Sequence, residues 1–268
     1  MDILVINLDR DKDRLENVRK QLTKFTRIDA VDSKKVGNDN SSLLLQWFGT
    51  KSMAGIMLSH MKCWKYIVEN NLEYALILED DFKLAVDEEE LVNYSKMVTS
   101  TAPDSWDVIL LGYFLGDFNG NDIFTKLVMR LRNMQGDQKD VNRYLFKPST
   151  WGGAHGYLLS RHGAKTLLKT FPKATYHVDF EMARLDFLNV YASKKKLISQ
   201  NISGKGSHNA YEILALKGWK MDHNEMDLDF FLSMPAFQVL GLEVSLWTAL
   251  QLFLIIYITW TFRAFQKT

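Results

Sequence analysis

Short apolar runs alternate with amphipathic segments along most of the chain, and this alternation limits the fold more than any other feature. Apolar runs predict strands at 3–8, 26–32, 73–78, 105–112 and 152–160. Segments with apolar residues at three- and four-residue spacing predict helices at 9–25, 52–70, 87–98 and 161–171. Strands that alternate with helices predict an α/β domain, in which helices flank a mostly parallel central sheet.

Composition narrows the class of protein further. An apolar fraction of 47% is enough to bury a full core, and a net charge of +1 gives no general attraction to nucleic acid. Cys63 is the single cysteine, so a disulfide framework within the chain is excluded and a reducing compartment is favoured. Its helical apolar surroundings indicate a core residue.

The stretch ALILEDDF, residues 75–82, places three acids directly after an apolar strand. Ligands of α/β sheets bind outside the carboxyl ends of strands. Adjacent side chains of a strand point to opposite faces, so Glu79 and Asp81 can converge while Asp80 points elsewhere. Their repulsion favours a cation between them, and oxygen ligands suit Mg²⁺ or Mn²⁺. The alternative is an acidic loop that faces water, or a helix N-terminus.

Several common catalytic motifs are absent from the sequence. It has no phosphate-binding GxxxxGK[ST] loop, no GxGxxG after a strand and no GxSxG turn. A metal that meets phosphates without a phosphate-binding loop points toward nucleotide-sugars. A phosphatase built on the same acids is a weaker alternative, because its other residues find no clear place in the sequence.

Six stretches carry a resemblance to a known family. They are VINLDRDKDRLENVRKQL (5–22), RIDAVD (27–32), GIMLSHMKCWKYI (55–67), ALILEDDF (75–82), WDVILLG (106–112) and GAHGYLLSRHGAKTLL (153–168). In this order they resemble glycosyltransferase family 25, over roughly residues 3–210. The resemblance implies a Rossmann-like GT-A fold and an inverting, metal-dependent enzyme. That enzyme would move a hexose, often galactose, from a UDP-sugar to a glycan or glycoprotein hydroxyl.

The resemblance also implies roles for individual residues. Glu79 and Asp81 stand in for the family's Asp-x-Asp-like motif as ligands of Mn²⁺ or Mg²⁺, and His208 is a further candidate ligand. A solvent-facing or structural histidine is the alternative for His208. Asp80 is expected to turn toward the ribose. Gly153 would let the backbone approach the donor sugar.

The remaining expected contacts concern the nucleotide. Asn7, Asp9, Arg10 and Arg14 match the first motif of the family and are expected at the nucleotide or its phosphates. Asp32 would meet the base or ribose. Ser59 and His60 match the second motif, although His60 shares a face with core residues.

The general base is expected among the acids of HVDFEM, as Asp179 or Glu181. Pairing of these acids with Arg184 or Arg161 is the alternative. A catalytically degenerate, membrane-tethered binding module with the same fold is the alternative function, because Glu replaces Asp at position 79.

The C-terminal part differs in character from the rest. Residues 244–262 form an uncharged run of apolar and aromatic residues, which predicts a hydrophobic helix long enough to anchor the chain in a membrane. A buried core helix, or an apolar surface that covers a partner, is the alternative. The predicted domains are a catalytic domain at 1–224 and a tail at 225–268. A single C-terminal anchor with a cytosolic catalytic domain is the simplest arrangement, although the charges that flank 244–262 favour a cytosolic C-terminus.

Overall fold

The fold was analysed in a computed structural model. It describes residues 1–42, 51–115, 139–148, 151–200, 235–239, 242–245, 249–250, 253–254 and 256–257. The chain divides into two compact units. The first comprises Met1–Asp117 and Gly136–Asn209, and the second comprises Phe118–Gln135 and Ala210–Thr268. The predicted boundary at residue 224 stays a prediction.

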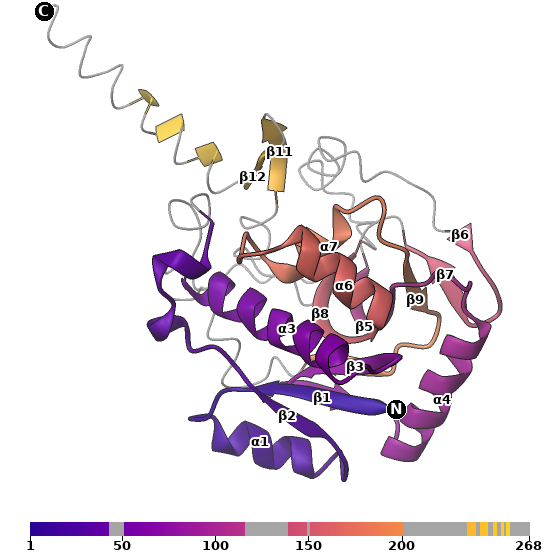
Figure 1. The fold of residues 1–268 in the computed structure, drawn as a ribbon. Helices are drawn as coiled ribbons and strands as arrows, with labels where there is room; N and C mark the ends of the chain where they lie inside the picture. Colours follow the sequence, from indigo (N-terminus) through magenta and orange to yellow (C-terminus); the bar gives the residue numbers. More distant parts are fainter. Residues whose placement is uncertain are drawn as a thin grey trace, which may run out of the picture. The chain divides into compact units, whose positions relative to one another are not determined.

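An eight-stranded sheet organises the first unit, with the strand order β2-β1-β3-β8-β5-β9-β7-β6 (Figure 1). Its strands are β1 (Asp2–Asn7), β2 (Thr26–Asp29), β3 (Tyr74–Glu79), β5 (Val108–Leu115), β6 (Lys139–Asp140), β7 (Leu145–Lys147), β8 (Trp151–Ser160) and β9 (Val190–Ser193). Only β8 and β7 run against the direction of the others. The predicted α/β class with a mostly parallel sheet is confirmed.

Helices cover both faces of this sheet (Figure 1). They are α1 (Lys12–Arg19), α3 (Lys51–Glu69), α4 (Glu88–Thr101), α6 (Arg161–Thr170) and α7 (Val178–Ala183). Short 3₁₀ turns, η1 (Ser33–Lys35) and η2 (Asn38–Asn40), follow β2. Two helices start at a side-chain cap: Asp87 accepts from the Glu90 N–H at 2.8 Å, and Ser160 accepts from the Gly163 N–H at 3.0 Å.

The alternation of side chains along each strand creates two cores. Ile77 of β3 packs in the cluster that α3, α6 and α7 cover, with Trp64 of α3 fully buried in it. Its neighbours Leu76 and Leu78 pack in the other cluster, which α1 and α4 cover. A strand buried on both faces has no alternation of polar and apolar residues, which explains why β3 appears as a continuous apolar run.

The short strands β6, β7 and β9 were not predicted, and two further unpredicted features lie close to the acids. One is the direction of β8, which lies antiparallel between β3 and β5. A buried strand is a continuous apolar run in either direction, so its sequence does not indicate which way it runs. The other is a small antiparallel sheet of β4 (Phe82–Leu84) and β10 (Ile198–Gln200), which begins directly after the three acids. Each of its strands has three residues, too few for a periodic pattern in the sequence.

The second unit is described only in part. β11 (Pro235–Val239) and β12 (Leu242–Ser245) pair antiparallel. The predicted hydrophobic helix at 244–262 is wrong at its start, because residues 244 and 245 belong to β12. Most of its remaining residues lie outside the described part. Within the described part, no helix is both long and apolar enough to cross a membrane.

Gly112 of β5 gives a test of the packing between β5, β8 and β10. A Cβ at this position would lie 2.7 Å from the His155 ring and 2.8 Å from the backbone oxygen of Ile198. We therefore expect Gly112→Ala to lower the free energy of unfolding by about 1–3 kcal/mol in urea titrations. Gly37→Ala is the matched control, since a Cβ at Gly37 meets nothing within 4 Å. Equal stabilities of the two variants would contradict this packing.

Candidate functional site

The three acids lie where β3 ends and turns into β4. Glu79 is the last residue of β3, Asp80 and Asp81 form the turn, and Phe82 opens β4. β3 runs parallel to β1, so this turn lies at the same edge of the sheet as Asn7, the last residue of β1. The carboxyl ends of parallel strands form the usual ligand-binding edge of such a sheet.

Asp80 is held by both oxygens. Its Oδ2 accepts from Asn7 Nδ2 at 2.7 Å, and its Oδ1 accepts from Arg14 at 2.9 Å. Asn7 in turn accepts from Arg27 Nε at 3.0 Å. Burial raises the pKa of Asp80, and the bonds from Arg14 and Asn7 offset only part of this effect. The structure thus brings together three predicted nucleotide-binding residues, but uses them to fix one another.

Glu79 points toward α3. Its Oε1 lies 3.2 Å from His60 Nε2, and about a quarter of its side chain is exposed. Burial opposes ionisation of Glu79. The hydrogen bond from His60 and the charge of Arg14 are among the effects that outweigh burial and lower its pKa. Glu79 is therefore ionised at neutral pH.

Asp81 has one oxygen satisfied and one not. Its Oδ2 accepts from Gln200 Nε2 at 2.9 Å, whereas its Oδ1 is buried and has no hydrogen-bond partner among the residues that the structure describes. Arg14 stands 4.0 Å from Oδ2. Burial and the nearby charge of Glu79 raise the pKa of Asp81 to about 7. A buried carboxylate oxygen without a donor is costly, and a bound cation would remove that cost.

The residues present fit a cation with few protein ligands. The described residues contain no group of three or more His, Cys, Asp or Glu side chains placed to hold a metal ion. Asp81 Oδ1 and the Glu79 carboxylate are thus the available ligands there. Mg²⁺ commonly takes one or two carboxylates, with water and substrate phosphates completing its shell. The predicted ligand His208 lies outside the described residues.

The predicted residues at the ends of β1 and β2 form an exposed group. Arg10 donates to Asp32 Oδ2 at 2.6 Å, and Asp32 also accepts from the Lys34 N–H at 3.0 Å. Asp9 contacts Lys12 at 3.1 Å and has three quarters of its side chain exposed. Their place at the carboxyl ends of two parallel strands is compatible with a nucleotide contact, which stays a prediction.

Ser59 and His60 are buried in α3. The Ser59 hydroxyl donates to the Gly55 carbonyl at 2.6 Å and accepts from the Val31 N–H at 2.8 Å. It therefore joins α3 to the loop after β2. His60 is 1% exposed and stacks on Tyr157, with ring centroids 5.7 Å apart. Both residues therefore have structural contacts here: Ser59 holds α3 against the loop after β2, and His60 packs on Tyr157 and contacts Glu79.

Gly153 and Asp179 meet at the beginning of β8. The Gly153 N–H donates to Asp179 Oδ2 at 2.7 Å. Gly153 has φ 82°, a left-handed conformation that favours glycine. Glu181 pairs with Arg184 at 2.5 Å, which is one of the two arrangements considered for the acids of this segment. Asp179 and Glu181 are both buried.

Two histidines near these acids were not predicted. Burial lowers the pKa of His155 to about 4, against the opposing charges of Glu79 and Asp179. Burial also lowers the pKa of His177, again against the charges of Asp179 and Glu79. The charges of the same two acids thus act on both histidines. A polar residue inside the apolar run of β8 was the available signal for His155.

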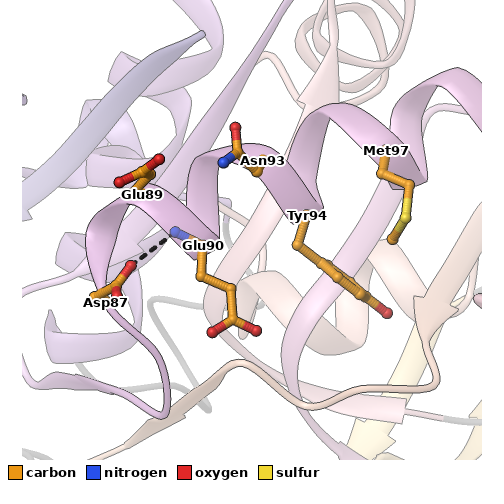
Figure 2. Close-up of a pocket in the computed structure, with 6 residues that line it drawn as sticks. All are labelled: Asp87, Glu89, Glu90, Asn93, Tyr94 and Met97. Carbon is orange, nitrogen blue, oxygen red and sulfur yellow. Dashed lines mark hydrogen bonds between the residues drawn. The ribbon is translucent and has the colours of Figure 1, made fainter.

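A shallow hollow of about 400 Å³ lies elsewhere, along α4. Figure 2 shows its six lining residues on the first three turns of that helix: Asp87, Glu89, Glu90, Asn93, Tyr94 and Met97. None of them is among the predicted site residues. Two of its acids already have structural partners, because Asp87 caps α4 and Glu90 forms an ion pair with Lys195. We assign the candidate site to the strand ends and not to this hollow.

Comparison with known protein families assigns a family to this chain. Residues 1–182 match the model of glycosyltransferase family 25, described as an LPS biosynthesis protein family. A Rossmann-like sheet with acids at this edge and this match define a chain of the glycosyltransferase class. The chain belongs to glycosyltransferase family 25.

Two curated relatives come from Xenopus laevis. Procollagen galactosyltransferases 1-B and 1-A are each 26% identical to this chain in an alignment of 193 positions that covers 64% of the chain. The match spans only 28% of the length of either relative.

Solved structures give weaker similarity. A197 from STIV has a TM-score of 0.35 at 10% identity, over 79% of this chain and 100% of that protein. Mouse xyloside xylosyltransferase 1 has a TM-score of 0.31 at 10% identity, and the match covers 65% of this chain and 64% of the mouse chain. At these scores the fold assignment rests on the chain's own topology.

The raised pKa of Asp81 predicts a pH-dependent stability. Between the ordinary aspartate pKa of 3.8 and about 7, the folded chain holds a proton here that the unfolded chain has lost. The contribution of Asp81 to stability therefore falls as the pH rises through this window. With divalent cations removed by chelator, we expect Asp81→Asn to raise Tm more near pH 8 than near pH 4.

The control for this experiment is Asp9→Asn. Asp9 is exposed, and its hydrogen bond with Lys12 lowers its pKa. Its contribution is present above pH 4 and lost as the pH falls, so its variant should show no gain at high pH. A gain for Asp81→Asn that is the same at both pH values would contradict the raised pKa.

Proposed function

We propose that this chain transfers a hexose, with galactose as the first candidate, from a UDP-sugar to a hydroxyl of a glycan or glycoprotein acceptor. Family membership and the names of the Xenopus relatives support sugar transfer. The observation that carries the proposal is the unsatisfied Asp81 Oδ1 beside the ionised Glu79, at the ligand-binding edge of the sheet.

Mn²⁺ or Mg²⁺ is the proposed cofactor. Asp81 Oδ1 and Glu79 would hold the cation, and the nucleotide diphosphate and water would complete its shell. When bound, the cation neutralises charge that develops on the diphosphate leaving group. Arg14 keeps its charge beside Asp80 and Asp81, so the chain itself also supplies a cation to this edge.

The chain's other residues would place the donor. Arg10, Asp32 and Asp9 stand at the ends of β1 and β2, where a nucleoside would contact them. Gly153 would let the backbone approach the donor sugar closely, because glycine has no Cβ. Ser59 and His60 would shape this edge from α3 without touching the nucleotide.

Asp179 is the proposed general base. In a single displacement, the acceptor oxygen bonds to the anomeric carbon, the bond to UDP breaks, and the acceptor's proton passes to the Asp179 carboxylate. The configuration at the anomeric carbon then inverts. Glu181 is a weaker candidate, since Arg184 holds its Oε2 at 2.5 Å.

A non-catalytic, membrane-tethered module that binds nucleotide-sugars is the second candidate. The observation that favours it is the bond between Glu79 Oε1 and His60, which uses one oxygen of a predicted ligand. Tethering through 244–262, with the catalytic unit in the cytosol, remains a prediction. Membrane fractionation of the chain with and without residues 244–268 would test it.

Removal of the Asp81 carboxylate tests the enzyme assignment. We expect Asp81→Ala to lower the rate of UDP release from UDP-galactose at least about 100-fold, because the proposed cation loses its principal ligand. Chelator should do the same to the wild type. Asp140→Ala is the control, since Asp140 is an exposed acid of β6. Binding of UDP-galactose with Mn²⁺ but no turnover with any acceptor would favour the binding module.

The identity of the base can be tested with two isosteric variants. Asp179→Asn keeps an oxygen for the Gly153 N–H but cannot take a proton, so we expect kcat to fall by about 10²–10⁴ with KM for the donor little changed. Glu181→Gln should lower Tm, because Arg184 loses its ion pair, and leave kcat within about threefold. The reverse pattern in steady-state kinetics would assign the base to Glu181.

A further inference from the structure

A chain of buried polar groups leads from the core to Glu79. Trp64 Nε1 lies 3.0 Å from the Tyr157 hydroxyl, and that hydroxyl lies 2.9 Å from His60 Nδ1. His60 Nε2 then meets Glu79 Oε1 at 3.2 Å. Trp64 and Tyr157 are fully buried, and His60 is 1% exposed. The proposed catalytic mechanism uses neither Trp64 nor Tyr157. Apolar residues could fill the same space, so the presence of their polar atoms calls for another explanation.

The direction of each hydrogen bond follows from the groups involved. An indole N–H can only donate, so the Tyr157 oxygen accepts from Trp64. Tyr157 has one proton, which it can give to His60 Nδ1. A neutral imidazole that accepts at Nδ1 carries its proton on Nε2, where it is donated to Glu79. The relay therefore selects one tautomer of His60.

The other arrangements leave a buried group unsatisfied. If His60 carried a proton on Nδ1, Tyr157 would accept twice and its own O–H would have no acceptor in this chain of groups. With the proton on Nδ1 alone, Nε2 would also present a lone pair to the Glu79 carboxylate. A buried polar group without a partner costs about 1–3 kcal/mol, so the network favours the Nε2–H form.

We infer that Trp64, Tyr157 and His60 are positioning residues that fix the Glu79 carboxylate with Oε1 toward α3 and Oε2 available to the cation. This inference rests on the proposed metal-dependent function. It also accounts for glutamate at position 79, because an aspartate is one methylene shorter and would lose contact with His60 or with the cation. His60 acts through Glu79 and does not touch the substrate.

Tyr157→Phe is the sharpest test, since it removes one hydroxyl and keeps the ring. We expect the Kd for Mn²⁺, measured by electron paramagnetic resonance with UDP present, to rise at least about tenfold. In the Glu79→Ala background the same change should leave the Mn²⁺ Kd within about twofold, because the relay then has nothing to position. Tyr94→Phe is the matched control, as its hydroxyl contacts Ser193 on the α4 side.

The outcomes separate this inference from the proposed function. Wild-type protein that binds no Mn²⁺ with UDP would overturn both. Normal Mn²⁺ binding by Tyr157→Phe, or an equal loss with and without Glu79, would overturn the relay alone. If Tyr157→Phe fails to fold, a measurement on the wild-type protein still tests the inference. Long-range ¹H–¹⁵N spectra should show His60 protonated on Nε2, and an Nδ1-protonated His60 would overturn the inference.

Discussion

Repulsion among three consecutive carboxylates at the end of a buried strand is the constraint on which the rest of the site depends. Each acid is met by a different part of the fold. Asn7 and Arg14 hold Asp80, His60 of α3 holds Glu79, and Gln200 of β10 holds Asp81. Among the described residues Asp81 Oδ1 finds no hydrogen-bond partner, and it is the oxygen to which we assign the proposed cation.

The supporting elements explain why so much of the chain is involved in so small a site. α3 carries both the Ser59 contact that joins it to the loop after β2 and the His60 contact that reaches the carboxylates. β8 carries Tyr157, whose hydroxyl contacts His60, and Gly153, whose N–H donates to Asp179. Since both strands of the small β4–β10 sheet adjoin Asp81, its pairing sets where Gln200 lies.

Local patterns predicted the framework well. Apolar runs located β1, β3 and β8, and the acids lie at the carboxyl end of β3 as predicted. Long-range partners were not predictable, because nothing near Gln200 in the sequence marks it as a neighbour of Asp81. The same holds for Tyr157, which appears only as an aromatic residue of an apolar strand until its hydroxyl is placed between Trp64 and His60. Segment 244–262 shows the limit of hydropathy, since its first residues pair in β12.

Anomalous scattering from crystals grown with UDP and Mn²⁺ would locate the proposed cation. We expect one Mn²⁺ peak about 2.0–2.3 Å from Asp81 Oδ1, within reach of Glu79 and in contact with the UDP diphosphate. UDP bound at another edge of the sheet, or bound at this edge with no Mn²⁺ peak beside Asp81, would contradict this expectation.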